Sequence, residues 1–445
     1  MELLAQMDQA RDLLQKAGVD GWELAASESR TLTIAVRDGE VDKFQAAHGQ
    51  GLSVRVYQDG RPGFAYVMGP QDDSLARAVD QAVAAAAAAD QDEHFALAEP
   101  GGSYAEVDVF DPALAAESTA DKLARANGLL QAAKDYDPRV THVHPAQVSE
   151  AESWFYLLNS RGLDLSRRAT RVSASAVAIA AEGDHQEMEG ESDSRRFLAE
   201  LDVAWVGRQA ARRAVACLGG APVPDGRYSV ILENRVAAEF LELLAQSLMG
   251  DNLVKGRSLL EPYQGKTGAS DLVTIIDDGL YPRGLATAAF DGEGTPTAAK
   301  TLVDQGVVRG FLFDLAWASR AGSRSTGNSL RSSLKLPPGV GMTNLYLQPG
   351  QGGLDELAAG LDRGLVVTEV MGMHTADPVS GEFSLGASGH LVEAGRVTRP
   401  VKSIALAGNL LDLFKSVEAI GGDLRFFGSL GCPSLLVSAL SVSGG

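Results

Sequence analysis

Histidines and acidic residues are the side chains in this sequence that could carry out metal chemistry. A catalytic zinc ion needs three protein ligands, together with a glutamate that takes a proton from the bound water. The chain has seven histidines and contains no H-E-x-x-H motif. The best pair is His142 and His144, because residues two apart on a strand point to the same side. They are either two metal ligands or polar residues of a solvated strand edge before Pro145.

Three acidic segments offer other ligand sets. Residues 184–189 alternate acidic side chains with other residues, but flanking glycines are typical of a charged hairpin tip. Residues 277–279 and 291–294 place carboxylates in glycine turns, where they could bind a cation or transfer protons. Asp-Gly pairs are ordinary turn residues and neither segment fits an EF-hand loop, so we expect structural roles. The residues concerned are Asp184, His185, Glu187, Glu189, Asp277, Asp278, Asp291 and Glu293.

Two other segments contain incomplete motifs. Ser388 and His390 lie in a G-A-S-G-H stretch, but G-x-S-x-G requires a serine centred between the glycines. Neighbours two apart on a strand also rarely form a catalytic pair. The G-G-D stretch that ends at Asp423 lacks the later glycine and the Lys-Ser/Thr of a phosphate-binding loop. Neither stretch is a complete catalytic or phosphate-binding motif.

Charge and composition narrow the range of partners. The chain has 58 acidic and 39 basic residues, and its net charge of −19 repels phosphate backbones and anionic lipids. The two cysteines, Cys217 and Cys432, fit neither a disulfide framework nor a zinc finger. The N-terminus predicts an amphipathic helix rather than a signal peptide, and the apolar tract at residues 82–89 is too short to cross a bilayer. We expect a cytoplasmic protein that binds neither nucleic acid nor a membrane.

The elements that position these side chains fall into three regions. A chain of 445 residues is too long for one hydrophobic core, which favours two or three domains. The first two regions combine antiparallel strands with helices, and the third is β-rich. We therefore predict an α+β protein with an N-terminal α/β region and a large β-rich C-terminal domain. The predicted domains are residues 1–100, 104–220 and 225–445, with helices in the last at 236–248, 355–361 and 410–420.

Periodicity predicts the elements of the first two regions. A helix over residues 3–17 ends at Gly18, and an antiparallel meander follows, with turns at Asp38-Gly39 and Asp59-Gly60. An alanine-rich helix opens at Asp72, Asp73 and Ser74 and runs to about residue 89. In the second region we predict helices at 118–133 and 203–217, and strands at 140–143, 154–158 and 172–181.

An ordered set of short segments resembles the TldD/PmbA family, whose PmbA branch is also called TldE. The resemblance covers essentially the whole chain. Its segments are G-L-S-V-R-V (51–56), G-R-P-G-F-A (60–65), F-D-G-E-G-T (290–295), S-T-G-N (325–328), T-N-L (343–345), P-G (349–350), S-G-E-F-S (380–384), residues 395–401, G-N (408–409) and G-G-D (421–423).

The resemblance implies a cytosolic dimer with an α/β N-terminal region and a β-rich C-terminal domain. It also implies that the TldD member is a zinc metalloprotease acting on peptides and unfolded polypeptides. That member carries an H-E-x-x-x-H motif after the first strand of the C-terminal domain, with a late cysteine as third ligand. The resemblance therefore implies that the corresponding segment of this chain decides whether it can bind a metal.

This chain departs from the motif. Anchored on Gly250-Asp251, the motif falls on residues 241–246, where Glu242 keeps the glutamate but Leu241 and Gln246 replace both histidines. Leucine has no lone pair for a metal, and a neutral amide is a poor zinc ligand. Cys432 could be a shifted third ligand, but one thiolate cannot hold a catalytic zinc by itself. We therefore expect no metal and no catalytic residue on this chain.

The helix over residues 236–248 leaves two interpretations of Glu242. Val236, Phe240, Leu244 and Leu248 lie on an apolar stripe that would pack on the sheet. Glu242 lies beside this stripe, where it either faces solvent or takes part in catalysis.

The leading hypothesis is a PmbA/TldE-like subunit of a two-component metalloprotease. A TldD-like partner would supply Zn²⁺ and the catalytic base, and this chain would complete a heterodimer or pair with itself. Extended peptide could be held by strand addition at a sheet edge. Two alternatives stay open: a peptide-binding adaptor without enzymatic activity, and a self-sufficient metallopeptidase. In the latter, the metal ligands would come from His142, His144, His185, His374, His390 or Cys432.

Overall fold

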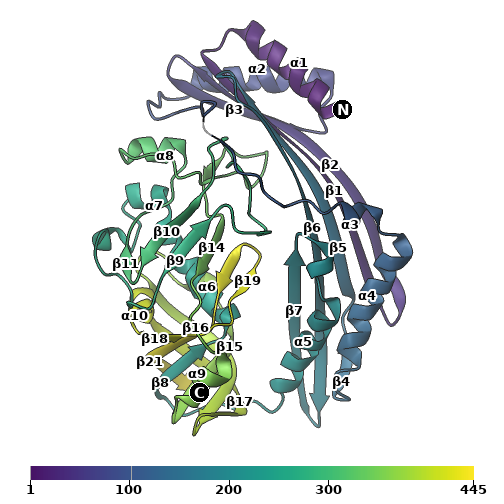
Figure 1. Cartoon of the computed structure of the whole chain (residues 1–445), viewed down its shortest axis with the longest axis vertical. Helices are drawn as coiled ribbons and strands as arrows, with labels where there is room; N and C mark the ends of the chain where they lie inside the picture. The colour runs from purple at the N-terminus through teal and green to yellow at the C-terminus, as the bar shows by residue number, and fades with distance from the viewer. Residues whose placement is uncertain (1, 102, 445) are drawn as a thin grey trace.

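The computed structural model describes residues 2–101 and 103–444, without the side chains of Glu2 and Asp72. A long, curved antiparallel sheet is built from the first half of the chain, and a β-rich C-terminal region lies on its inner side (Figure 1). This arrangement confirms the predicted α+β class. The predicted role of the Asp72 side chain at a helix start lies outside the described part.

The N-terminal sheet has the strand order β3-β2-β1-β5-β6-β4, with β7 paired to β6. All its pairings are antiparallel, and the tight turns after β1 and β2 have positive φ at Asp38, Gly39, Asp59 and Gly60. The predicted meander is confirmed. The strands are β1 (Gly21–Arg37), β2 (Glu40–Gln58), β3 (Arg61–Met68), β4 (Val140–Val143), β5 (Ala146–Asn159), β6 (Asp164–Glu182) and β7 (His185–Arg195).

Helices cover the outer face of this sheet at two places. At one end α1 and α2 bury Met7, Leu14 and Ala82 against Leu24 and Leu52 of the sheet. At the other end α4 and α5 pack on β6 and on each other. The helices are α1 (Glu2–Ala17), α2 (Asp72–Ala88), α3 (Pro112–Ala116), α4 (Thr119–Lys134) and α5 (Val203–Ala216), with a short 3-10 turn η1 (Leu198–Glu200).

The sheet runs without interruption across the predicted boundary near residue 100, because β1 pairs with both β2 and β5. The domain boundaries proposed from the sequence stay a prediction. The predicted helices near residues 3–17, 72–89, 118–133 and 203–217 are confirmed, and Ser118 accepts a hydrogen bond from the Asp121 backbone as N-cap of α4.

The described part of the C-terminal region contains two six-stranded sheets and one strand pair. One sheet has the order β17-β16-β15-β8-β21-β18, and a further pairing of β17 with β21 closes it on itself. The other has the order β11-β10-β9-β14-β20-β19. The strands are β8 (Gly226–Leu232), β9 (Ile275–Asp278), β10 (Ala299–Asp304), β11 (Val307–Val308), β12 (Ser329–Leu330), β13 (Gly339–Val340), β14 (Asn344–Leu347), β15 (Arg363–Met371), β16 (Glu382–Glu393), β17 (Arg396–Asn409), β18 (Val417–Ile420), β19 (Arg425–Phe427), β20 (Leu430–Cys432) and β21 (Leu435–Gly444).

Short helices connect these strands. The predicted helix 410–420 is wrong beyond Lys415, because Val417 and Ile420 pair with β21 and are buried there. Sequence periodicity also missed α7 and α8, each only one to two turns long. The helices are α6 (Asn234–Ala245), α7 (Gly250–Val254), α8 (Leu315–Arg320), α9 (Leu354–Ala359) and α10 (Leu410–Lys415), with 3-10 turns η2 (Gln246–Leu248), η3 (Glu261–Tyr263) and η4 (Met373–Thr375).

Buried ion pairs connect the two halves of the molecule. Arg55 of β2 donates hydrogen bonds of 3.1 Å to Glu23 of β1 and to Glu293 of the C-terminal region. Arg331 also bonds Glu23, and all four side chains are almost completely buried. No helix within the described residues combines the length and apolar character that crossing a bilayer requires.

Candidate functional site

A cleft of about 830 Å³ lies between the N-terminal sheet and the C-terminal region. Strand β7 and its neighbour β6 form one wall. Helix α6 and the β19–β20 hairpin, which face β7 in Figure 1, form the other. Strands β7 and β19 each pair with a single neighbour in the described part, so two sheet edges border the cleft.

Helix α6 presents one polar face to this cleft. Arg235, Glu239 and Glu242 line it at a spacing of four and three residues, which places them on one side of the helix. Glu242 is exposed and lies in the cleft, so the glutamate of the motif position reaches a cavity. Leu241, by contrast, is fully buried in the core of the C-terminal region, and Gln246 is exposed after the last turn of α6.

Carboxylates are the most numerous charged groups that line the cleft. Glu189, Glu239, Glu242 and Glu369 line it together with Glu191. Burial, followed by the charge of Glu369, raises the pKa of Glu189. Burial likewise raises the pKa of Glu239, with Glu242 and Glu369 adding to the effect. Such a cluster favours a cationic or hydrogen-bond-donating ligand over an anionic one.

Two arginines of the C-terminal region bind the free edge of β7. Arg235 donates to the Gly190 carbonyl at 3.3 Å, and Arg425 donates to the Ser192 carbonyl at 3.0 Å. Both guanidinium groups also bind Glu191. Although burial opposes them, these cations hold the pKa of Glu191 below its usual value. Toward the β6–β7 turn the edge is more open, since Met188 is 61% exposed.

The residues around α6 do not fit a zinc site. Leu241 packs in the core, and the amide of Gln246 lies apart from the cleft lining. Among the described residues no three histidine, cysteine or acidic side chains converge as metal ligands would. The expectation that this chain holds no metal of its own stays a prediction.

The histidines and the cysteine of the alternative metal set lie apart. The rings of His142 in β4 and His144, which follows β4, are 5.6 Å apart, and the edge position of β4 agrees with the structural interpretation. His185 lies at the β6–β7 turn and His374 in η4. His390 lies in β16 and contacts the Ala216 carbonyl at 3.0 Å. Cys432 lies in β20 and is fully buried, and this burial raises the pKa of its thiol well above the usual value.

The serine candidate and the charged turn also have structural partners. Ser388 donates to Glu369 at 2.9 Å rather than to His390. Asp184 occupies the turn between β6 and β7, as the hairpin interpretation predicts, while Glu187 binds Lys402. Glu189 differs, because it lines the cleft.

The carboxylates of the glycine turns hold the C-terminal region together. Asp277 is fully buried, accepts hydrogen bonds from Thr343 and Asn328, and forms an ion pair with Lys300. The Asp278 carboxylate accepts from the backbone of its own turn. Three further carboxylates accept hydrogen bonds from backbone amides. Asp291 accepts from residues 293, 295 and 329. Glu293 accepts from residue 315, and Asp423 accepts from residue 434.

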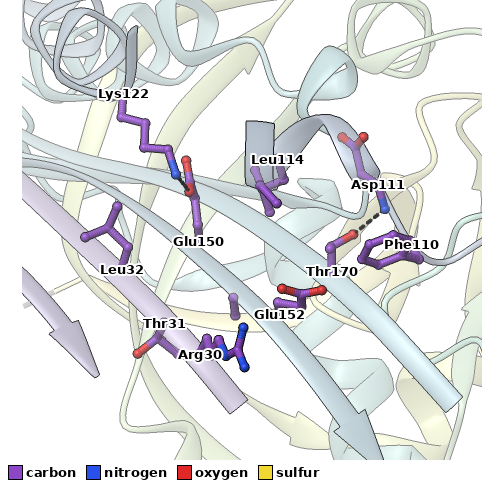
Figure 2. Close-up of a pocket in the computed structure, with 12 residues that line it drawn as sticks. Arg30, Thr31, Leu32, Phe110, Asp111, Leu114, Lys122, Glu150, Glu152 and Thr170 are labelled. Carbon is purple, nitrogen blue, oxygen red and sulfur yellow. Dashed lines mark hydrogen bonds and ion pairs between the residues drawn. The ribbon is translucent and has the colours of Figure 1, made fainter. Parts of the chain in front are cut away.

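A smaller cavity of about 170 Å³ lies on the outer face of the N-terminal sheet, beneath α3 and α4 (Figure 2). Lys122 donates to Glu150 at 2.5 Å, and Arg125 donates to the other oxygen at 3.1 Å. The Thr170 hydroxyl accepts from the Asp111 backbone. Because two cations of α4 neutralise Glu150, we assign this cavity a structural role.

Sequence reasoning did not recognise Arg235, Glu239 and Glu369 as lining residues of one site. Two signals were present. Arg235, Glu239 and Glu242 make a polar stripe on an otherwise apolar helix, and Glu369 interrupts the apolar run of β15. The distance along the chain between α6, β15 and β7 hid their proximity.

Family models match the chain in three parts. The PmbA/TldA metallopeptidase domain 1 matches residues 22–86, the central domain residues 112–218 and the C-terminal domain residues 225–444. Metalloprotease PmbA of Escherichia coli O157:H7 is 27% identical over 100% of this chain and 99% of its own. A metalloprotease PmbA homolog of Haemophilus influenzae is 28% identical over 100% of this chain and 96% of its own.

Solved structures share the fold over almost the whole length. A Thermotoga maritima protein described as a modulator of a DNA gyrase is 28% identical, with a TM-score of 0.90 over 99% of this chain and 100% of its own. TldE from Thermococcus kodakarensis is 23% identical, with a TM-score of 0.88 over 98% of this chain and 100% of its own. The chain belongs to the PmbA/TldD metallopeptidase family.

Proposed function

We propose that this chain is a PmbA/TldE-type subunit of a cytoplasmic metalloprotease and binds extended peptide in the cleft between β7 and α6. A TldD-like partner supplies the zinc ion, the activated water and the catalytic base. The observation that carries the proposal is the cleft itself, which combines free strand edges with one surviving glutamate of the motif, Glu242, and lacks the motif histidines.

The surroundings of α6 support a role without a metal. A ligand at position 241 would have to leave the core, where Leu241 packs among Ala237, Leu244 and Leu248. Exposed Gln246 offers only a neutral amide. The cleft face of α6 is instead made of Arg235, Glu239 and Glu242, which suits hydrogen bonding to a polypeptide.

The open part of the β7 edge around Met188 and the edge of β19 support peptide binding by strand addition. Backbone hydrogen bonds at a strand edge bind any extended polypeptide without demanding a particular sequence. Folded proteins do not offer such a strand, so the same mechanism selects unfolded chains. The surrounding carboxylates add a preference for peptides that carry basic residues.

The first test is reconstitution. The purified chain and a TldD-like partner are assayed for zinc and for peptidase activity on an unfolded polypeptide, alone and mixed. We expect about one zinc per partner, none on this chain, and activity that depends on the partner. The Glu242→Gln variant of this chain should keep most of the activity of the mixture, because Glu242 is not the catalytic base.

Other results would change the assignment. Zinc on the isolated chain, with peptidase activity that chelation and Glu242→Gln both abolish, would establish a self-sufficient metallopeptidase. Peptide binding without any activity in the mixture would favour an adaptor. Sedimentation of the mixture distinguishes a heterodimer from a homodimer of this chain.

A further inference from the structure

A third cavity, of about 350 Å³, lies between the inner face of the N-terminal sheet and the C-terminal region. Arg167 of β6 and Arg196, which follows β7, reach it from the sheet side. Asp291 and Ser329 line it from the C-terminal region. Met342 lines both this cavity and the peptide cleft, so the two spaces adjoin.

Arg167 lines this cavity with a guanidinium group that has no carboxylate partner among the described residues. Its guanidinium group stacks on Phe155 and Phe290, with 4.8 and 5.5 Å to the ring centroids. Its one hydrogen bond in the described part goes to the Phe290 carbonyl at 3.1 Å, and no acidic oxygen of that part lies within 4.0 Å. Burial lowers the pKa of Arg167 to about 10, against the opposing charge of Asp291.

Arg196 is a second cation of the same kind. It is 8% exposed and donates only to backbone carbonyls of the described residues, those of Thr170, Gly284 and Leu285. Burial, followed by the charge of Arg167, lowers its pKa to about 10. Two guanidinium groups therefore line one small cavity, and each has unused capacity to bind an anion.

The other polar groups do not neutralise this charge. Asp291 accepts three backbone hydrogen bonds, and burial together with Glu293 raises its pKa to about 7. Arg331 is paired with Glu23. The Ser329 hydroxyl is buried and has no hydrogen-bond partner among the described residues, so it can donate to a ligand.

We propose that this cavity binds a carboxylate, and that this carboxylate is the C-terminal group of a peptide lying in the adjoining cleft. The choice of a peptide rests on the proposed function. A guanidinium group presents two parallel N–H donors that match both oxygens of a carboxylate. The volume of this cavity is at the lower end of the range for ligand sites, so it can hold the terminal residue of a peptide but not a longer segment.

The test compares one unfolded hexapeptide of alanine and serine, labelled at its N-terminus, as free acid and as C-terminal amide. Fluorescence anisotropy with the full chain should show the free acid binding roughly tenfold tighter or more. Bulk electrostatics predicts the opposite order, because the chain carries a net charge of −19. A preference for the acid therefore reports a local cation.

Arg167→Gln should remove this preference and leave the affinity for the amide unchanged. The matched control is Arg171→Gln, an exposed arginine of the same strand, which should keep the preference. The melting temperature of Arg167→Gln should not fall, since the substitution removes a buried cation that lacks a carboxylate. A fall of several degrees in the melting temperature would show that Arg167 stabilises the fold, and it would overturn the proposal.

The remaining outcomes separate this proposal from the proposed function. Equal affinity of acid and amide for the unaltered chain overturns the carboxylate site and leaves peptide binding intact. Failure of both peptides to bind overturns the proposed function. In that case, the melting temperature with N-acetylglycine tests whether the cavity binds a carboxylate. A rise that requires Arg167 supports the cavity as a site for free carboxylates. If the melting temperature does not rise, the carboxylate site is overturned.

Discussion

Asp291 shows how burial changes the chemistry of a single residue. Its carboxyl group lies at the junction of the two halves and is 4% exposed. Burial and the charge of Glu293 raise its pKa from 3.8 to about 7, although three backbone amides oppose this. Asp314, raised to about 6, follows the same pattern beside the same glutamate. Both groups therefore bind protons more tightly in the folded chain than in the unfolded chain.

We expect the contribution of Asp291 to stability to fall as pH rises. Below about pH 4 the Asp291 carboxyl group is protonated in both the folded and the unfolded chain, and its contribution to stability is complete. Between about pH 4 and 7 it ionises in the unfolded chain first. The free energy of unfolding therefore declines by at most about 1.4 kcal/mol per pH unit. Denaturation of Asp291→Asn from pH 4 to 8 should give a flatter profile. The control is Asp271→Asn, at an exposed aspartate. If Asp291→Asn and the unaltered chain show the same dependence of stability on pH, the raised pKa of Asp291 is contradicted.

For single residues, the sequence predicted the role of a side chain better than its place in the fold. The structural interpretation of Asp277 and Asp291 follows from their glycine turns, and it agrees with their backbone and side-chain partners. The cleft position of Glu242 could not be predicted, because helical periodicity distinguishes a buried face from an exposed one but does not show what lies opposite. Arg167 was not predicted either, since a lone arginine on a strand resembles any solvated charge.

Strand β7 is the element on which peptide binding depends. Ser192 and Gly190 turn their carbonyls away from β6 toward arginines, and alternation along a strand gives Met188 the same outward orientation. The backbone of Met188 is thus available to an added strand, whereas its neighbours on either side bond to β6.

Met188→Pro should weaken peptide binding with little effect on stability. Proline removes an outward-facing N–H and no hydrogen bond to β6, and edge strands tolerate it. The matched control is Met188→Thr, which changes the side chain but keeps the N–H and should bind peptide normally. Anisotropy with the amidated hexapeptide measures the effect. Equal binding by both variants would place the peptide elsewhere in the cleft.

Elements were predicted well where local signals decide them. The Asp-Gly turns, Gly18 and the Ser118 cap each determine a backbone geometry by themselves. The predicted helix at 410–420 failed in its second half, because Val417 and Ile420 pair with Val437 and Leu435 of β21, which lie 20 and 15 residues further along the chain. A pattern within one segment contains no information about such pairing.

At the scale of the whole molecule, Arg55 connects the sheet to the C-terminal region. It lies between two buried carboxylates, Glu23 and Glu293, whose charges raise its pKa although burial opposes them. Glu293 is 238 positions away along the chain. No motif predicts such a pairing, which depends on the complete tertiary structure.

Arg55→Met should destabilise the chain by about 3–5 kcal/mol, because it leaves buried carboxylates without their shared cation. Arg30→Met is the control: Arg30 pairs with Glu28 at an exposed position, and its loss should cost less than about 1 kcal/mol. Urea denaturation followed by tryptophan fluorescence measures both. Adding Glu293→Gln to Arg55→Met should recover part of the loss, and an Arg55→Met effect as small as that of the control would refute this account.

The position of β21 has a consequence for biosynthesis. Strand β8 begins the C-terminal region, yet its two neighbours are β15 and β21, which the ribosome produces more than a hundred residues later. The N-terminal sheet can form while translation continues, since all its strands precede residue 196. One edge of β8 can pair with β15 once residues 363–371 have emerged, but the other edge stays unpaired until residues 435–444 emerge. A nascent chain stalled before that point would expose an apolar strand to chaperones and to neighbouring chains.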